Sequence, residues 1–223
     1  AAGSAGVQLC VVAGDSSGSL ILTGIDDSVF EGDESLSVSS AAFSAAATLS
    51  DDDSAPVLTA LGIAPPSFGE NGGTAVLAGS MSNASTSDTC FDLNFAGVAQ
   101  RDVDYSSTDD DAGSAGIQLC VAAGDLSGLL DLAAIDDTVF EGDETLSVDS
   151  GGLTATATIS DDDARPMLTD LLITPGSFSE NGGVALVTAS VSNTATTDTC
   201  LDLSFAGAAT VGIDFSSGDD DAG

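Results

Sequence analysis

The chain has 223 residues, of which 36 are Asp or Glu and two are Arg, while Lys and His are absent, so the formal net charge is −34. Nucleic acids and acidic membrane surfaces bind through basic side chains, and Arg101 and Arg165 are too few to form such a surface, so both partners are excluded. No apolar run approaches the roughly 18 to 20 residues of a spanning helix, so membrane insertion by this segment is not expected. Hydrophobic residues make up 43% of the chain, which is enough for a folded core.

Carboxylates dominate the chemistry that this composition offers. Without His or Lys, the usual general base, the imidazole metal ligand and the Schiff-base amine are missing. A high density of carboxylates suits hard, oxygen-binding cations, above all Ca²⁺. We therefore expect a cation-binding protein and no enzyme, with glycosidase chemistry by a carboxylate pair as the enzymatic alternative.

Alternation of apolar and polar residues predicts strands throughout, with no helical periodicity. In chain order, the strand-like runs of one repeat are 74–81, 90–95, 116–122, 127–135, 144–149 and 154–160. Within the second run, Phe91, Leu93 and Phe95 share one face and Cys90 lies on the other. About seven strands in 110 residues are typical of a β-sandwich.

The chain repeats itself with an offset of 110 residues and no gap. GSAGVQLC at 3–10 returns as GSAGIQLC at 113–120, and residues 1–110 match residues 111–220 at 67 of 110 positions. Two copies of one module are therefore present.

Module boundaries are expected at two prolines, because Pro56 and Pro166 each follow an Asp triplet and interrupt the strand pattern. We predict a complete module at 55–164, the C-terminal half of a preceding module at 1–54 and the N-terminal half of a following module at 165–223. Half a sandwich exposes a sheet face and unpaired edges. Each half must therefore be completed by neighbouring polypeptide, either more of one long chain or another copy docked head to tail.

The most distinctive motif is I-D-D-x-V-F-E-G-D-E, at 25–34 and 135–144, followed by S-D-D-D at 50–53 and 160–163. Strand ends and a turn would gather these carboxylates at one end of a sandwich. Like charges about 4 to 6 Å apart repel by on the order of 1 kcal/mol per pair even at a high effective dielectric constant, so such a cluster needs cations. The alternative is a merely solvated acidic loop.

These segments resemble tandem Calx-β domains, the Ca²⁺-binding β-sandwiches of sodium/calcium exchangers and of many large bacterial surface or filament proteins. The resemblance extends to S-F-x-E-N-G-G at 67–73 and 177–183, and to V/I-D-Y/F-S-S at 103–107 and 213–217. It implies an all-β fold of tandem immunoglobulin-like, Calx-β type β-sandwich modules that bind Ca²⁺.

The resemblance also implies the Ca²⁺ ligands, which are carboxylates apart from the backbone carbonyl of a valine. In the complete module they are Glu70, Asp104, Asp136, Asp137, Val139, Glu141, Glu144, Asp161, Asp162 and Asp163. In the preceding half they are Asp26, Asp27, Val29, Glu31, Glu34, Asp51, Asp52 and Asp53, and in the following half they are Glu180 and Asp214. Ser28 and Thr138 replace an acid that is frequent in the family, which leaves the number of ions per site open.

The four cysteines are two copies of one pattern. Cys90 and Cys120 lie on the outward faces of strands expected to be adjacent, which favours a cross-strand disulfide. Cys10 and Cys200 are the matching halves of pairs that would be completed across the two ends of the chain. No His is present to activate a thiol, so a catalytic cysteine is not expected.

Two surface features keep more than one interpretation. Asn83-Ala84-Ser85 is an N-glycosylation sequon, and the Ser/Thr-rich stretches 82–89 and 192–199 are candidates for O-glycans, with plain turns as the alternative. Acidic loops at 109–111 and 219–221 lie outside the family motifs. We expect these loops to be solvated, with a peripheral ion or an intermodule contact as the alternative.

These observations predict an extracellular or cell-surface structural repeat, a Ca²⁺-rigidified stalk or filament of the adhesin or matrix type. Its expected partners are further copies or modules of the same protein, head to tail, with ions at the module junctions. The alternative is a calcium sensor module that regulates an attached domain. Near-identical copies favour repetition of a mechanical unit over a dedicated sensor.

Overall fold

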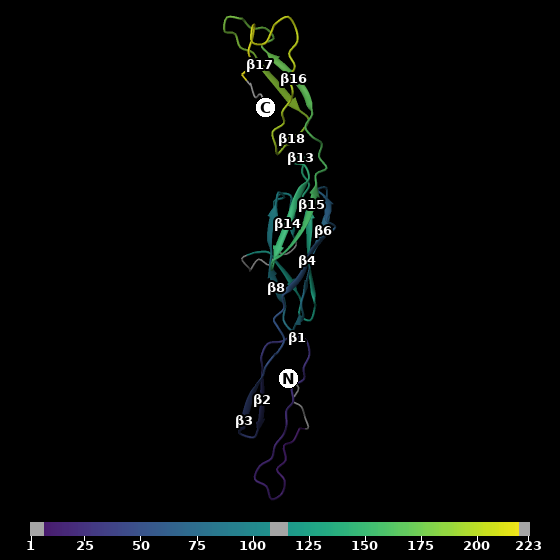
Figure 1. Cartoon of the computed structure of the whole chain (residues 1–223), viewed down its shortest axis with the longest axis vertical. Coiled ribbons are helices and arrows are strands. Elements are labelled where there is room, and N and C mark those ends of the chain that lie inside the picture. The colour runs from purple at the N-terminus through teal and green to yellow at the C-terminus, as the bar shows by residue number, and fades with distance from the viewer. Residues whose placement is uncertain (1–6, 108–115, 219–223) are drawn as a thin grey trace.

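The computed structural model describes residues 7–107 and 116–218, and every element within these two ranges is a β-strand. Figure 1 shows an elongated molecule with a sandwich of strands in the middle and smaller sets of strands toward the two ends. The all-β fold class predicted from the alternating pattern is confirmed. No helix that could cross a membrane occurs in the described residues.

The middle sandwich consists of two four-stranded sheets and one additional strand pair. The first sheet has the order β10 (Tyr105–Ser107), β12 (Ser127–Ala134), β6 (Thr74–Met81) and β4 (Leu58–Ala64). The second has the order β5 (Ser67–Gly69), β15 (Leu153–Ser160), β14 (Glu144–Ser150) and β9 (Asn94–Gly97). The pair is β8 (Thr89–Asp92) with β11 (Gln118–Val121).

The core of this sandwich is built from the inward residues of alternating strands. Leu77, Leu132, Leu146 and Val148 are all 0% exposed, while polar and small residues between them face outward. Full burial of one such side chain stabilises the fold by about 1.5 to 3 kcal/mol. Period-two alternation therefore places one apolar face of each sheet against the other.

The sandwich contains more strands than the predicted seven or so, because short and divided strands leave a weak pattern. The run 90–95 divides at Leu93, where β8 pairs with β11 and β9 pairs with β14 of the second sheet. β5 and β10 have only three residues each. Phe91, Leu93 and Phe95 nevertheless all face the core, as the alternation predicts.

Two smaller segments flank the sandwich. The N-terminal segment, residues 7–54, contains β1 (Val29–Phe30) and the hairpin of β2 (Glu34–Ser40) with β3 (Phe43–Leu49). The C-terminal segment, residues 165–218, contains the hairpin of β16 (Leu168–Thr174) with β17 (Leu186–Val191), and β18 (Thr194–Ala195). The boundaries predicted at 54/55 and 164/165 remain a prediction.

Both segments meet the sandwich through the same contact, 110 residues apart. β1 pairs in parallel with β7 (Ala84–Ser85), and β13 (Val139–Phe140) pairs in parallel with β18. Thr86 donates its N–H to the Phe30 carbonyl at 3.1 Å, and Thr196 donates to Phe140 at 3.2 Å. The guanidinium of Arg165 also lies 5.3 Å from the centre of the Phe140 ring, within cation–π range.

The predicted disulfide between Cys90 and Cys120 is confirmed. The two residues lie directly opposite each other on β8 and β11, with Cα atoms 4.0 Å apart. Cys10 and Cys200 are free and exposed. The acidic loops at 109–111 and 219–221 lie outside the described residues.

Candidate metal centre

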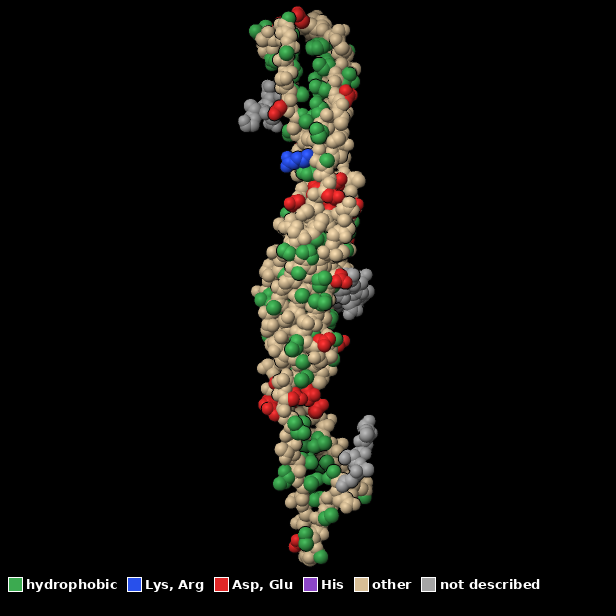
Figure 2. All heavy atoms as spheres, turned by 90° about the vertical axis from the view of Figure 1, so that its right-hand side faces the viewer, with side chains coloured by type: hydrophobic (Ala, Val, Ile, Leu, Met, Phe, Trp, Pro, Cys, Tyr) green, Lys and Arg blue, Asp and Glu red, His purple; other side chains and the backbone are tan. Residues whose placement is uncertain are grey.

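Two groups of three carboxylates form at one end of the middle sandwich. The Glu70 cluster contains Glu70, Asp161 and Asp163, and the Asp104 cluster contains Asp104, Glu141 and Glu144. Within each cluster, one carboxylate oxygen per residue lies within 4.8 Å of the others. Figure 2 shows acidic side chains gathered at the levels where the sandwich meets its neighbouring segments.

Asp161 organises the turn between β13 and β14, which carries Glu141 and leads into Glu144. Its Oδ2 atom accepts hydrogen bonds from the N–H groups of Glu141 at 2.8 Å and Gly142 at 2.5 Å, and Oδ1 accepts one from Asp163 at 2.7 Å. Gly142 has φ +78°, a conformation that favours glycine. The end of β15 is thereby fastened to the turn between β13 and β14, which brings the two clusters side by side.

Burial raises the free-energy cost of holding several negative charges in the two clusters. The side chains of Glu70 and Asp104 are only 5% and 6% exposed. Burial and the negative charges of Asp137 and Asp161 raise the pKa of Glu70 to about 7. A charged Glu70 is thus disfavoured at this position unless a cation neutralises it.

The neighbouring carboxylates of the same end behave similarly. Burial and the adjacent Asp104 carboxylate raise the pKa of Glu144 to about 7. Burial and neighbouring carboxylates also raise the pKa values of Glu141 and Asp163. For Asp161, burial acts in the same upward direction, but its three backbone N–H donors outweigh it and lower the pKa.

The residues present fit a hard cation with the radius of Ca²⁺. All six side chains offer carboxylate oxygens, the ligands that Ca²⁺ prefers, and no soft ligand takes part. Oxygens on opposite sides of a Ca²⁺ ion are about 5 Å apart, because each Ca–O distance is about 2.3 to 2.6 Å. The 4.8 Å limit within each cluster therefore fits one ion shell.

The other ligands predicted for this module lie beside the clusters without joining them. Asp137 accepts a hydrogen bond from the Val139 N–H at 2.6 Å and so shapes the turn, and Val139 itself pairs with the next segment through β13. Asp162 accepts one from the side-chain amide of Asn71 at 3.1 Å. Asp136 contributes negative charge near Asp163. Metal ligation by these four residues remains a prediction.

Asn71 is the residue that the sequence interpretation missed. It follows Glu70 in the S-F-x-E-N-G-G motif and ties that motif to the Asp triplet after β15. Its position directly after a predicted ligand was the available signal.

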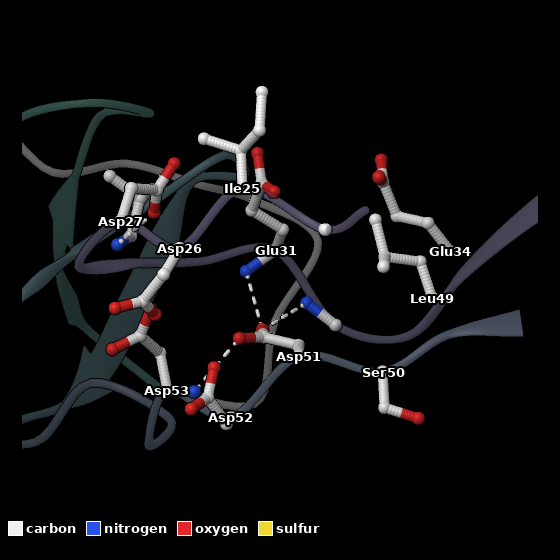
Figure 3. A pocket seen from close by; sticks show the side chains of 13 residues that line it. Ile25, Asp26, Asp27, Glu31, Glu34, Leu49, Ser50, Asp51, Asp52 and Asp53 are labelled. Carbon is white, nitrogen blue, oxygen red and sulfur yellow. Dashed lines mark hydrogen bonds between the residues drawn. The ribbon is translucent and has the colours of Figure 1, made fainter. Parts of the chain in front are cut away.

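The N-terminal segment repeats the same turn without completing a cluster. Asp51 accepts hydrogen bonds from Glu31 at 2.7 Å, Gly32 at 2.6 Å and Asp53 at 2.9 Å, as Figure 3 shows. The predicted ligands of this segment line one pocket: Asp26, Asp27, Val29, Glu31, Glu34, Asp51, Asp52 and Asp53. Over the described ranges, three-carboxylate groups of this kind are found only in the middle sandwich.

The C-terminal segment holds the remaining two predicted ligands. Asp214 accepts a hydrogen bond from the Thr210 N–H at 2.7 Å, as Asp104 does from Gln100 at 2.5 Å. Glu180 and Asp214 are exposed and belong to neither cluster.

Comparisons with known proteins find only distant structural likeness. No family model matches, and no curated protein matches. Among solved structures, calcium binding domain CBD12 of CALX1.1 is 21% identical with a TM-score of 0.34, covering 47% of this chain and 45% of that chain. The apo-form Calx CBD1 domain is 20% identical with a TM-score of 0.33, covering 46% and 98%. Domains 4 and 5 of the S-layer protein SbsC are 12% identical with a TM-score of 0.30, covering 60% and 58%.

Likeness of this extent does not define a function. The fold and the site place this chain in the class of all-β sandwich proteins with clustered carboxylates that could hold a metal ion.

Proposed function

We propose that this chain is a segment of an extracellular structural rod or filament, built from tandem Calx-β type modules and stiffened by Ca²⁺ at the module junctions. One observation carries the proposal. The strand β13, which pairs with the next segment through β18, lies between Asp137 and Glu141, directly before the turn that supplies Glu141 and Glu144 to the Asp104 cluster. An ion bound there stabilises the module end and the junction together.

The charge of the chain supports a structural role for the ion. The formal net charge is −34 and only two side chains are basic, one of which, Arg101, lies 3.9 Å from Asp102. Removal of a neutralising Ca²⁺ would leave carboxylates a few ångströms apart, each pair repelling by about 1 kcal/mol or more. Ca²⁺ binding to the folded state alone raises stability by mass action.

The repeated junction supports a rod. The parallel contact of β1 with β7 returns as β13 with β18, so two successive junctions have the same hydrogen-bonding pattern. The Cys90–Cys120 disulfide supports an oxidising, extracellular setting, where Ca²⁺ modules of modest affinity are saturated. Sequence identity between repeats supports a mechanical unit.

N-glycosylation at Asn83 would compete with the junction. The Asn83 side-chain nitrogen donates to the Ser54 carbonyl at 2.9 Å and to the Ala84 carbonyl at 3.5 Å. A glycan on this nitrogen replaces one of the two hydrogens, so one bond would be lost. We therefore propose no N-glycan at Asn83, and we keep O-glycans on the Ser/Thr-rich stretches 82–89 and 192–199 as the only glycan candidates.

The test measures Ca²⁺ binding and melting of the whole chain. We expect millimolar Ca²⁺ to raise the melting temperature by more than about ten degrees over EGTA. The variant Glu70→Gln with Asp104→Asn should lose most of this gain, whereas Asp170→Asn, an exposed acid on β16, should keep it. Equal melting curves with and without Ca²⁺ would contradict the proposal.

Electron microscopy separates a rod from a sensor. A rod appears as a thread that softens in EGTA. A discrete particle that changes shape on Ca²⁺ removal would instead support the alternative, a calcium sensor that regulates an attached domain.

A further inference from the structure

Each carboxylate cluster of the middle sandwich draws its members from both halves of the module. Glu70 and Asp104 come from the first half, residues 55–107, whereas Asp161, Asp163, Glu141 and Glu144 come from the second half. Moving by one repeat, Glu180 and Asp214 are the counterparts of the first two and lie in the C-terminal segment. The counterparts of the other four, Asp51, Asp53, Glu31 and Glu34, lie in the N-terminal segment.

Apolar residues that are buried in the middle sandwich have exposed counterparts in the two flanking segments. Leu146 and Val148 are 0% exposed, but their counterparts Leu36 and Val38 on β2 are 42% and 53% exposed. Phe68 is 6% exposed, but its counterpart Phe178 is 51% exposed. Figure 2 shows these segments with hydrophobic side chains open to view. Each segment thus presents the face that the middle sandwich covers with its other half.

Strand pairing in the sandwich identifies what covers these faces. β11 and β12 are strands because they pair with β8 and β6 of the first half. Their counterparts at 8–11 and 17–24 form no strand, because the counterparts of β8 and β6 lie in the C-terminal segment. β2 and β3 do form, because they pair with each other. Each segment therefore lacks a half-module of the kind that the other segment provides.

The two segments cannot meet within one chain. β2 and β3 lie toward one end of the long axis and β16 and β17 toward the other, with the sandwich between them (Figure 1). A second copy of this chain carries the complementary surface for each segment. Contacts of this heterologous, head-to-tail kind continue from copy to copy and build a filament.

We propose that the C-terminal segment of one copy and the N-terminal segment of a second copy close into a full sandwich. The closed sandwich completes two shared ion sites. One contains Glu180 of the first copy with Asp51 and Asp53 of the second, and the other contains Asp214 of the first with Glu31 and Glu34 of the second. The ion-binding part of this inference rests on the proposed function.

Cys200 and Cys10 allow the contact between two copies to be detected as a disulfide. They are the counterparts of Cys90 and Cys120, which form a disulfide, and both are free and exposed in the single chain. In the closed sandwich, Cys200 of one copy lies opposite Cys10 of the next. Exchange with a small external disulfide forms this bond: the two thiols are oxidised, the external disulfide is reduced to two thiols, and the protons pass to them.

The experiment uses the full chain with Ca²⁺ and oxidised glutathione as the small disulfide. We expect a ladder of covalent multimers on non-reducing gels and, by peptide mapping, a link between Cys10 and Cys200. Val38→Asp places a charge on the exposed face of β2 and should leave a folded single chain with no ladder. Ser39→Asp is the matched control, because the next residue faces the other way and its counterpart is already Asp149.

Ion stoichiometry separates this inference from the proposed function. Assembled wild-type chains should bind close to twice as many Ca²⁺ ions per chain as Val38→Asp. This variant keeps only the ion sites of the middle sandwich. Glu180→Gln should assemble but bind fewer ions than the wild type. If Val38→Asp binds no Ca²⁺, the proposed function is contradicted. The head-to-tail contact is still tested by the covalent multimers of the wild type.

Three outcomes would overturn the inference. Wild-type chains that remain single by sedimentation at about 100 μM in Ca²⁺, links confined to Cys10–Cys10 and Cys200–Cys200, or equal assembly by Val38→Asp would each exclude the head-to-tail contact. Assembly with no additional bound ions would exclude the shared ion sites.

Discussion

The carboxylate of Asp161 accepts a 2.5 Å hydrogen bond from the backbone N–H of Gly142, and Asp51 accepts the same bond from Gly32 at 2.6 Å one repeat earlier. The turn therefore forms whether or not the rest of the module is present. What the isolated turn lacks is the buried acid that each cluster takes from the first half of the module.

Replacing Asp161 with Ala should destabilise the chain even without Ca²⁺. The change removes a charged acceptor for three backbone N–H groups, and hydrogen bonds to charged groups contribute about 1.5 to 3 kcal/mol each when intact. We expect a loss of about 2 to 4 kcal/mol in the free energy of unfolding, measured by urea denaturation in EGTA. Asp162→Ala is the control and should cost less than about 1 kcal/mol, since Asp162 accepts its hydrogen bond from the exposed side-chain amide of Asn71.

Stability without Ca²⁺ should fall as pH rises from about 5 to about 8. The pKa values of Glu70 and Glu144 are about 7 in the folded chain and about 4.5 when unfolded, so between these values the folded state holds protons that the unfolded state has released. Their stabilising protonation is complete below the unfolded pKa and is lost as pH rises through the folded pKa. The lowered pKa of Asp161 acts oppositely, but only near and below pH 4.

The measurement is the melting temperature in EGTA at several pH values. Ca²⁺ displaces these protons, so a saturating concentration should flatten or reverse the slope. A melting temperature that rises with pH in EGTA over this window would contradict the raised pKa values of Glu70 and Glu144.

Two leucines one repeat apart should respond very differently to truncation. Leu146→Ala removes a side chain that is fully buried and should cost about 2 to 5 kcal/mol in the free energy of unfolding. Leu36→Ala, its counterpart on an exposed face, should change the stability of a single chain by less than about 0.5 kcal/mol. Both are measured by denaturation at low protein concentration, and similar losses would show that the N-terminal segment is already covered.

Gly142→Ala should test the turn through its backbone alone. Nothing lies within 4 Å of the Cβ that the change adds, but φ is +78°, where a side chain costs about 1 to 2 kcal/mol. We expect a loss of that size and weaker Ca²⁺ binding, measured by melting and calorimetry. Gly62→Ala on β4 also has free space and an ordinary φ, so it should leave both quantities nearly unchanged.

The sequence by itself determined the local features of this protein. Alternation of apolar residues predicts strands because successive side chains of a strand point to opposite faces, and this placed Leu93 on the core side and Cys90 on the outer side correctly. The repeat offset identifies counterparts such as Leu36 and Leu146 with no knowledge of the fold. Motif spacing likewise indicated where acids collect.

Only the tertiary structure decided which acids meet and which surfaces stay open. Glu70 joins Asp161 because β5 pairs with β15 across the sequence, and no local pattern encodes that pairing. Asp136, Asp137 and Asp162 belong to the same motifs but stay outside both clusters; Asp137 accepts a hydrogen bond from Val139, and Asp162 accepts one from Asn71. Leu36 and Leu146 have nearly the same neighbours in sequence, with Ser35 in place of Thr145, yet one is exposed and one buried, because burial depends on a partner strand from the other half of a module.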